Sequence, residues 1–417
     1  MRSYRRYTAA VVVLGDIGRS PRMCYHAYSL ATELDYNVKL IGYLESTPHP
    51  LIHNNPCISY VAVAPPPDCL ARLPEAVQLP LKFIWTFLFL SWALLFRVGW
   101  DVKLILMQNP PALPTMFVCW MVKTLSFSVF FTFLISNKYG MLIRTFPKVL
   151  KTKNNNVSVL QKPGACGRKA DAGLCVTRAM REDMQKAWGV HAAVFYDRPL
   201  KFSLADKHEL LLRLGLNENG QVFGAQPTED VTRFSIRDPS TGQVRFRDDR
   251  PLLAISSTSW TPDEDFQILL DAVKKSPATR LPVIVLIITG RGPLKKYYVE
   301  KIKRMKIEFV HTLWLESEDY PLMIATADLG VSLHTSSSGL DLPMKVVDMF
   351  GAGIPVLAKR FNCIGELVQD GQNGHLFDTA TDLFQQLYTL ATGFPTHCKV
   401  SILLISLGNS ALCKNAL

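Results

Sequence analysis

The 417-residue sequence lacks the cysteine patterns of a disulfide framework or a zinc site. Its nine cysteines are an odd number, are scattered along the chain, and never form a Cys-x-x-Cys pair. Disulfide-rich secreted domains and zinc ribbons need paired or closely spaced cysteines. The cysteine pattern therefore predicts reduced thiols in a cytosolic compartment and offers no metal ligands.

The sequence also lacks a signal peptide and an uncharged run of membrane-spanning length. The basic N-terminus leads into an apolar stretch that Gly15 and Asp16 cut short, which excludes a secretory signal. Residues 83–96 carry no charge, but fourteen residues are too few to span a bilayer. Because this segment contains two tryptophans and is flanked by Lys82 and Arg97, we expect it to bind a membrane surface peripherally. The alternative is a fully buried helix.

Signatures of nucleic-acid binding are absent as well, since no basic motif is interleaved with aromatic residues. The charge balance is nevertheless positive, with 46 lysines and arginines, 35 acidic residues and a net charge of +11. A basic protein attracts anionic partners. The partners that remain are a nucleotide, a pyrophosphate or anionic lipid headgroups, unless the charge serves solubility alone.

The sequence consists mainly of alternating strand and helix patterns. Residues 8–14 form a continuous apolar run of the kind that is buried on both faces of a parallel sheet. Residues 15–19 make a turn with two glycines, and Ser20 and Pro21 are typical of a helix start. Residues 38–43 form the next strand. This pattern predicts an α/β fold, in which ligands bind at the carboxyl ends of the strands.

The second half of the chain repeats the pattern. Strands are expected at residues 251–256, 283–288 and 327–333. A glycine turn at residues 289–293 follows the second of these strands, and residues 261–264 are typical of a capping box at a helix start. Because the carboxyl ends of parallel strands meet at one edge, we expect these turns to converge on one crevice.

A hydroxyl-rich loop at residues 334–341 runs straight into a short helix. We expect Asp341 to cap this helix and Pro343 to lie in its first turn. The unpaired N–H groups and the positive dipole end of the helix then face the loop, which predicts an anion site. Lys345 and Asp348 lie on the flank, where a phosphate and a sugar diol fit; the alternative is a surface ion pair between them. The expected buried face consists of Leu342, Val346, Met349 and Phe350.

Residues 336–351 resemble the donor loop of the chitobiosyldiphosphodolichol beta-mannosyltransferase family, whose members add the first mannose to the dolichol-linked N-glycan precursor. Further similar stretches follow in a fixed order and together cover most of residues 8–380. They are Val13 to Met23, Leu106 to Pro111, Cys175 to Asp183, Ser256 to Thr261 and Trp314 to Pro321. Long runs in a fixed order make chance an implausible source of the resemblance.

The resemblance implies an α/β fold of the GT-B class, with two facing Rossmann-like domains and a cleft between them. We expect an acceptor- and membrane-facing domain at residues 1–197 and a GDP-sugar domain at residues 251–395. Residues 198–250 are expected to form a linker and a mobile polar insertion, and residues 396–417 a divergent tail. The expected reaction moves mannose from GDP-mannose to chitobiosyl-diphosphodolichol in a beta-1,4 linkage, at the cytoplasmic face of the endoplasmic reticulum membrane.

The same resemblance suggests roles for individual residues. Asp348 is expected to bind the donor's ribose, while Lys345 and Arg291 neutralise the leaving diphosphate. No metal or cofactor is expected, because no Asp-x-Asp pair stands at a strand end and GDP-mannose is itself a substrate. The other expected partners are dolichol-linked chitobiose, a membrane surface and other mannosyltransferases of the pathway. The remaining donor-side candidates are Gly290, His334, Ser336, Ser337, Ser338 and Gly339. The acceptor-side candidates are Gly15, Gly18, Arg19 and Ser20, although such a glycine turn often reflects close packing alone.

The sequence departs from the family between residues 136 and 173. Where the family keeps a Trp-His-Asn-Tyr-Gly run, residues 136–140 read Ser-Asn-Lys-Tyr-Gly, so the histidine is missing. An inverting transfer needs a general base beside the acceptor hydroxyl, and Asp16 is the candidate that remains. Two alternatives stay open: a non-catalytic or truncated relative that binds nucleotide or partner glycosyltransferases, and a transferase with another acceptor.

Overall fold

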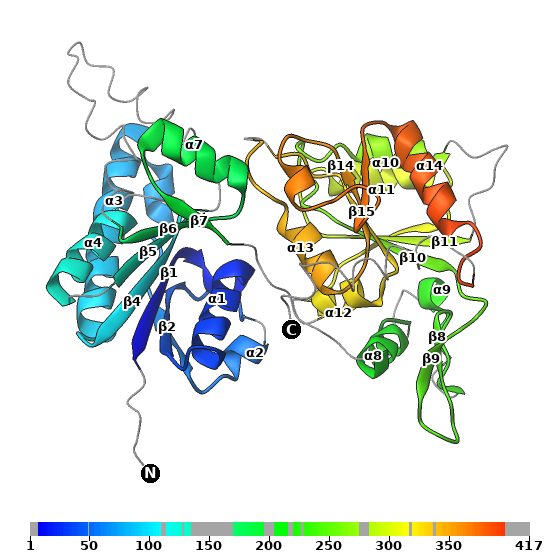
Figure 1. Cartoon of the computed structure of the whole chain (residues 1–417), viewed down its shortest axis with the longest axis horizontal. Coiled ribbons are helices and arrows are strands. Elements are labelled where there is room, and N and C mark those ends of the chain that lie inside the picture. Colours follow the sequence, from blue (N-terminus) through cyan, green and yellow to red (C-terminus); the bar gives the residue numbers. More distant parts are fainter. Residues whose placement is uncertain are drawn as a thin grey trace. The chain divides into compact units, whose positions relative to one another are not determined.

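The computed structural model describes residues 7–48, 50–109, 114–126, 129–134, 170–195, 204–215, 220–226, 229–274, 283–316, 319–336 and 339–396. The chain forms two compact units, Met1–Tyr196 and Asp197–Leu417 (Figure 1). Each unit is built on its own parallel sheet, which confirms the α/β class. The boundary between the units lies beside residue 197, where the sequence predicts the first domain to end.

Within the described residues, the sheet of the first unit has seven strands in the order β3-β2-β1-β4-β5-β6-β7. These strands are β1 (Thr8–Asp16), β2 (Asn37–Tyr43), β3 (Ile58–Ala62), β4 (Val102–Asn109), β5 (Val129–Leu134), β6 (Ala172–Cys175) and β7 (Ala192–Val194). The first six residues of β1 are buried, as expected for an apolar strand that is covered on both faces. The helices are α1 (Pro21–Thr32), α2 (Pro50–His53), α3 (Glu75–Trp92), α4 (Thr115–Ser126) and α7 (Arg178–Trp188), with short turns η1 (Ile17–Arg19), η2 (Asp68–Arg72) and η3 (Ala93–Arg97).

The turn that follows β1 lies at the point where the strand order of the first sheet reverses, between β1 and β4. Asp16 ends β1, η1 follows, and α1 begins at Pro21 with Ser20 as its N-cap, as the sequence predicts. The Ser20 hydroxyl does not cap the helix; it donates a hydrogen bond to the carbonyl of Asp16 at 3.0 Å. The hydroxyl therefore stabilises the turn that presents Asp16 at the sheet edge.

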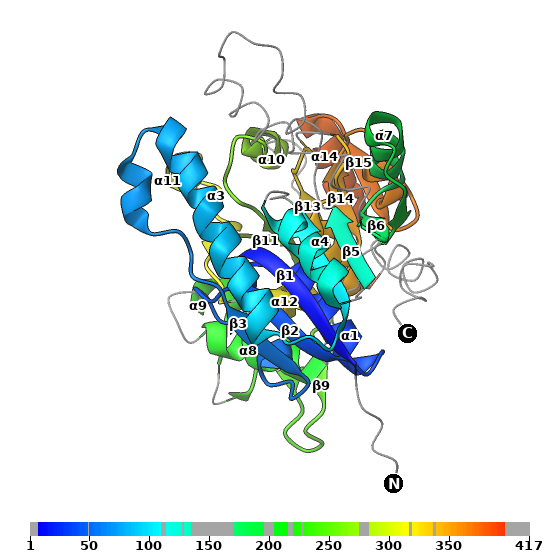
Figure 2. The same ribbon diagram turned by 90° about the vertical axis from the view of Figure 1, so that its left-hand side faces the viewer.

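The uncharged stretch at residues 83–96 lies in a helix that is longer than the sequence predicts. α3 continues into the π-helical turn η3, and Val77–Arg97 is the one helix of the described chain that is long and apolar enough to cross a membrane. The expectation of insufficient length is therefore wrong. The alternative of full burial is wrong as well, because only 22% of the helix's most apolar window is buried. The length was underestimated because Lys82 lies within the helix and does not end it. Figure 2 shows α3 and α4 side by side, where the rings of Phe87 and Phe117 lie 6.1 Å apart.

The sheet of the second unit has six strands within the described residues, in the order β12-β11-β10-β13-β14-β15. They are β10 (Leu252–Ser257), β11 (Ile284–Thr289), β12 (Val310–Leu313), β13 (Leu329–Ser332), β14 (Val356–Lys359) and β15 (Gly374–Phe377). The helices are α8 (Leu204–Gly215), α9 (Gly220–Phe223), α10 (Phe266–Lys274), α11 (Lys295–Arg304), α12 (Asp319–Thr326), α13 (Met344–Gly351), the turn η6 (Ile364–Glu366) and α14 (Ala380–Ala391).

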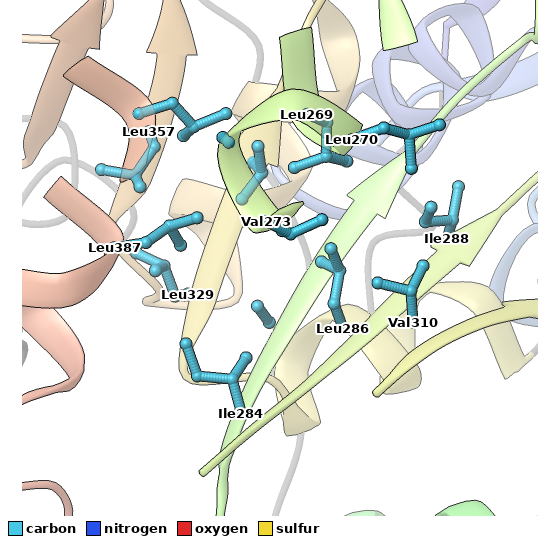
Figure 3. Close-up of a cluster of buried hydrophobic side chains, with 14 of the residues drawn as sticks. Leu269, Leu270, Val273, Ile284, Leu286, Ile288, Val310, Leu329, Leu357 and Leu387 are labelled. Atoms are coloured by element: carbon cyan, nitrogen blue, oxygen red, sulfur yellow. The ribbon is translucent and has the colours of Figure 1, made fainter. Parts of the chain in front are cut away.

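The core of the second unit fixes the positions of its strand ends. Ile284, Leu286 and Ile288 alternate along β11 and point to the same face of the sheet (Figure 3). Leucines of α10 and α14 cover this face, and each fully buried side chain contributes about 1.5–3 kcal/mol to stability. The loops at the carboxyl edge of the sheet therefore start from a rigid platform.

Residues 204–250 carry secondary structure, which differs from the expected linker and mobile polar insertion. α8 buries His208, whose ring nitrogens lie 2.8 Å from Ser235 Oγ and 3.0 Å from Asp230 Oδ1. Ser235 begins β8 (Ser235–Arg237), which pairs with β9 (Val244–Phe246) in a hairpin. Arg250 then bonds to the buried Asp328 at 2.6 and 2.7 Å. These contacts make the segment part of the second unit.

Candidate functional site

The strand order of the second sheet reverses between β10 and β13, and the carboxyl ends of these strands mark the place where ligands bind in open α/β sheets. β12, β11, β10 and β13 are parallel neighbours, so the loops that follow them leave the sheet at the same edge. These loops and α13 carry all the donor-side residues that the sequence predicts. Ser337 and Ser338 lie outside the described residues.

The glycine turn after β11 is pressed against the loop after β10. Gly290 has φ of +126°, and a Cβ added there would lie 1.8 Å from the carbonyl oxygen of Thr258. A Cβ on Gly292 would lie 1.8 Å from the carbonyl oxygen of Ser259. Only glycine fits at either position, so close packing explains both residues. The same packing holds Arg291 at the sheet edge between them.

Arg291 lies against an exposed tryptophan from the neighbouring strand end. The Arg291 guanidinium carbon lies 3.5 Å from the ring centroid of Trp314, which follows β12 and is 45% exposed. The Trp314 indole donates a hydrogen bond to Glu316 Oε1 at 3.2 Å. Stacking on an aromatic face leaves the guanidinium charged and able to donate to an anion.

Glu264 is a site residue that the sequence did not predict. Its side chain is 2% exposed, and its Oε2 accepts hydrogen bonds from the Thr258 hydroxyl and, at 2.9 Å, from the Ser259 backbone N–H. Its Oε1 binds the ammonium of Lys345. The predicted capping box is wrong, because α10 begins at Phe266 and Glu264 instead forms a backbone bridge to His334. The carboxylate thereby joins the loop after β10 to α13.

The loop before α13 folds on its own hydroxyl and carboxylate groups. α13 begins at Met344, and its N-cap residue is Pro343 and not the predicted Asp341; the Pro343 side chain makes no cap hydrogen bond. The Ser336 hydroxyl donates to Asp341 and accepts from the Gly339 N–H at 2.9 Å, while Gly339 has φ of +71°. The predicted core face is confirmed. Its four residues, Leu342, Val346, Met349 and Phe350, are each 6% exposed or less.

Lys345 and Asp348 are both half-buried on the flank of α13, so Lys345 does not lie at an open surface. Its ammonium is held by Glu264, so its charge is already paired in the structure. Beside it, burial lowers the pKa of His334, and the charge of Lys345 lowers it further. The imidazole is therefore neutral at pH 7, and within the described residues its buried Nε2 makes no hydrogen bond. A neutral imidazole can donate to or accept from a sugar hydroxyl.

The acceptor-side candidates lie in the first unit, around the turn after β1. Asp16 Oδ1 accepts from the backbone N–H groups of Glu45 and Ser46 at 3.2 and 3.1 Å, and Oδ2 accepts from the Ser46 hydroxyl. Burial raises the pKa of Asp16, but hydrogen bonds from Ser46, Glu45 and Gly18 together lower it below its usual value. The carboxylate thus anchors one loop to another, and its role as a catalytic base stays a prediction.

Of the other acceptor-side residues, Gly18 is tightly packed, whereas Gly15 and Arg19 are not. A Cβ on Gly18 would lie 2.6 Å from the Ser46 carbonyl oxygen, whereas one on Gly15 would meet nothing within 4 Å. The Arg19 side chain is 78% exposed, with its Nε 3.4 Å from Asp16 Oδ2. The divergent segment at residues 136–173 lies outside the described residues except for its last four. The expected tail at residues 396–417 lies outside them except for its first residue.

Comparisons with known proteins identify the family. Residues 250–392 match the family model described as glycosyl transferases group 1. Chitobiosyldiphosphodolichol beta-mannosyltransferase from Homo sapiens is 41% identical over an alignment that covers 94% of this chain and 87% of the relative. The protein of that name from Dictyostelium discoideum is 38% identical, covering 92% of this chain and 84% of its own length. This chain belongs to the chitobiosyldiphosphodolichol beta-mannosyltransferase family.

Membership of this family confirms the resemblance drawn from residues 336–351 and makes the chain a glycosyltransferase. A relative from Arabidopsis thaliana, named UDP-glycosyltransferase TURAN, is 38% identical over 94% of this chain and 91% of its own length.

Solved glycosyltransferase structures confirm the GT-B fold class. Sucrose-phosphate synthase from Thermosynechococcus elongatus superposes with a TM-score of 0.60 at 11% identity, covering 99% of this chain and 94% of its own. HepE from Anabaena, in complex with UDP and glucose, gives a TM-score of 0.59 at 15% identity, with 99% and 95% covered. At these identities the likeness concerns the fold alone.

Proposed function

We propose that this member of the family transfers mannose from GDP-mannose to chitobiosyl-diphosphodolichol, with inversion to a beta-1,4 linkage and without a metal ion. One observation carries the proposal: the N-terminus of α13 lies at the reversal point of the second sheet, with Lys345 on its first turn. A helix start of this kind binds anions through its free N–H groups and its dipole. The names of the relatives support the sugar and the acceptor.

In this proposal the chain's charges stabilise the leaving diphosphate. Negative charge grows on the diphosphate as the bond to mannose breaks, and fixed donors aimed at that charge lower the barrier. Arg291 is exposed and supplies a guanidinium, and the positive dipole end of α13 adds a favourable potential. Lys345 contributes less net charge than its position suggests, because Glu264 neutralises it. Asp348, one helical turn further along, is proposed to accept hydrogen bonds from the ribose hydroxyls.

The apolar face of α3 supports membrane contact. Five residues spaced three or four apart form one stripe, and each is at least 38% exposed. The opposite face of the helix packs on the sheet through buried residues such as Leu90 and Leu94. We therefore propose that α3 lies on the cytoplasmic surface of the endoplasmic reticulum membrane, where a dolichol-linked acceptor is held. The stripe consists of Leu81, Ile84, Leu88, Trp92 and Phe96.

The proposal is tested by incubating the purified chain at high concentration with GDP-mannose and a chitobiosyl-diphosphate lipid. We expect a trisaccharide lipid whose mannose is released by a beta-mannosidase and resists an alpha-mannosidase. UDP-glucose replaces GDP-mannose in a matched control and should give no product. Absence of product from GDP-mannose, even after the family's Trp-His-Asn-Tyr run is restored, would contradict the proposal.

A further inference from the structure

We infer that the loop after β12 reads the base of the donor nucleotide, and that Glu316 with Trp314 selects guanine. The inference rests on the proposed function, because it explains how that donor site chooses its nucleotide. Trp314 is 45% exposed, Leu315 is 7% exposed, and Glu316 is exposed again. This alternation places the ring and the carboxylate on the same, outward side of the loop, while Leu315 anchors it.

The position of the loop fits the length of a nucleoside diphosphate. In the order β12-β11-β10-β13, three strand spacings separate β12 from β13, whose following loop leads into α13. Neighbouring strands lie about 4.8 Å apart, so the span is about 14 Å. A nucleotide with its diphosphate at the start of α13 therefore reaches the end of β12 with its base.

The side chains along this span are arranged in the order that such a ligand requires. Arg291 lies on the intervening strand end and stacks on Trp314 at 3.5 Å. Its guanidinium thus lies against the ring that we propose stacks on the base. An aromatic side chain offers a stacking surface to any base, and losing one such contact weakens binding by about tenfold to a hundredfold. Stacking alone gives affinity without choosing a base.

The Glu316 carboxylate supplies the selectivity for guanine. Guanine presents two adjacent donors, N1–H and the N2 amino group, and a carboxylate accepts both through its two oxygens. Glu316 Oε1 is oriented by the Trp314 indole N–H at 3.2 Å, and within the described residues Oε2 makes no hydrogen bond. Uracil presents one N–H between two carbonyl oxygens, so its carbonyls would face the negative charge. Adenine offers one donor beside an acceptor, so it can donate to only one of the two carboxylate oxygens.

Calorimetry on the full chain with GDP, inosine diphosphate and UDP tests the inference. Inosine diphosphate lacks only the N2 amino group. We expect it to bind about tenfold more weakly than GDP, and UDP more weakly again, because a site built for hydrogen bonds rejects a ligand that leaves them unmade.

The informative variant is Glu316→Gln. A carboxamide presents one acceptor and one donor, which suits uracil's N3–H and O4, so we expect GDP affinity to fall about tenfold while UDP affinity rises. A purely structural role for the Trp314–Glu316 hydrogen bond cannot produce opposite shifts for the two ligands.

Glu308→Gln is the matched control. It removes the same charge from an exposed glutamate that precedes β12, at the opposite end of that strand, and should leave every affinity unchanged. Equal changes for GDP and UDP in Glu316→Gln, or no change in either, would overturn the inference while the donor site stands. Failure of the unaltered chain to bind GDP would instead overturn the proposed function and this inference with it.

Discussion

The two sheets share one feature, a reversal of strand order, but their loops use it differently. In the second unit, the loops after β12, β11, β10 and β13 leave the same edge of the sheet and expose side chains there, among them Arg291 and Trp314. In the first unit, Asp16 stands at the equivalent edge, and the loop after β2 occupies its carboxylate with three hydrogen bonds. The edge of the second sheet exposes a guanidinium and an aromatic ring, whereas the carboxylate at the first reversal is held by a neighbouring loop.

This difference teaches that a reversal of strand order can either expose polar groups or have them filled by a neighbouring loop. Glu264 pairs Lys345 in the second unit, yet the Arg291 side chain is exposed there and stacks on Trp314. In the first unit, the Asp16 carboxylate is already hydrogen-bonded. The divergent segment at residues 136–173 therefore matters more for the acceptor-side chemistry. Under the proposed function, the donor side follows its family without interruption, whereas the acceptor side depends on residues 136–173.

The largest expected effect concerns that acceptor half. We predict that the chain binds GDP but transfers mannose slowly, because the family's histidine is replaced by Asn137. Restoring the Trp-His-Asn-Tyr run over residues 136–139, together with the family's following helical stretch, should raise kcat by about 10²–10⁴. Initial rates on the chitobiosyl-diphosphate lipid measure the gain.

The control for this prediction restores every other position but keeps Asn137, and it should stay slow. GDP affinity should be the same in all three proteins, because donor binding does not use this segment. Rapid transfer by the unaltered chain would show that the missing histidine matters little, and the contrast between the two halves would then disappear.

The next largest effect concerns Lys345. Sequence position alone suggests that Lys345→Ala leaves the fold intact, but the structure pairs this ammonium with a glutamate that is 2% exposed. Breaking a buried ion pair from one side costs about 3–5 kcal/mol, because the remaining charge is left without a partner. Urea unfolding of the second unit should show this loss, and calorimetry should show weaker GDP binding.

The double variant Lys345→Ala with Glu264→Gln separates the two effects. Removing the stranded charge should restore most of the stability, while GDP affinity stays low because the ammonium is still missing. Stability that is unchanged in Lys345→Ala would mean that the pair contributes nothing to the fold. The rigid support for the donor loops would then have to come from the glycine packing alone.

Much of this architecture follows from local pattern. Continuous apolar runs predict β1, β10 and β11 to within one or two residues, because a strand buried on both faces needs such a run. The core face of α13 follows from helical spacing for the same reason. These features depend on burial, and buried positions carry apolar residues at the regular spacing of a strand or a helix.

The site was predicted less completely, because its contacts join residues that are distant in the chain. Thr261 to Glu264 has the spacing of a capping box, yet Lys345, 81 positions later, draws the Glu264 carboxylate away. Asp341 was expected to cap α13, but it accepts from Ser336 within its own loop. Short polar side chains often bond the nearest hydroxyl or N–H, and local sequence does not reveal which partner wins.

A smaller effect is expected at the apolar stripe of α3. Among the described residues, no helix of the second unit is long and apolar enough to cross a membrane. Leu88→Glu with Trp92→Glu should reduce sedimentation with liposomes about tenfold or more, because each buried apolar side chain contributes about 1.5–3 kcal/mol. Tyr388→Glu, at a 37% exposed position on α14, is the control. Since the other face of α3 packs on the sheet, alkaline washing should release the unaltered protein. Complete resistance to it would indicate a spanning helix.

The smallest expected effect concerns Asp16, and it tests whether this carboxylate has only a structural role. The folded-state pKa of Asp16 lies below its usual value, so its contribution to stability is complete above the unfolded pKa of about 3.8 and is lost as the pH falls through the folded value. Asp16→Asn should therefore lower the melting temperature at pH 7, and the difference from the unaltered chain should shrink below pH 4.

If Asp16 only anchors the Ser46 loop, the same variant changes the transfer rate little once the protein is folded. If Asp16 is the base, Asp16→Asn lowers kcat by about 10² or more without a matching change in KM. Melting curves at pH 7 and pH 3, together with kcat and KM of the chain and the variant, separate the two roles. A large fall in kcat would mean that the hydrogen bonds of Ser46 and Glu45 hold a reactive carboxylate in place, so that both sheets carry a working site at their reversals.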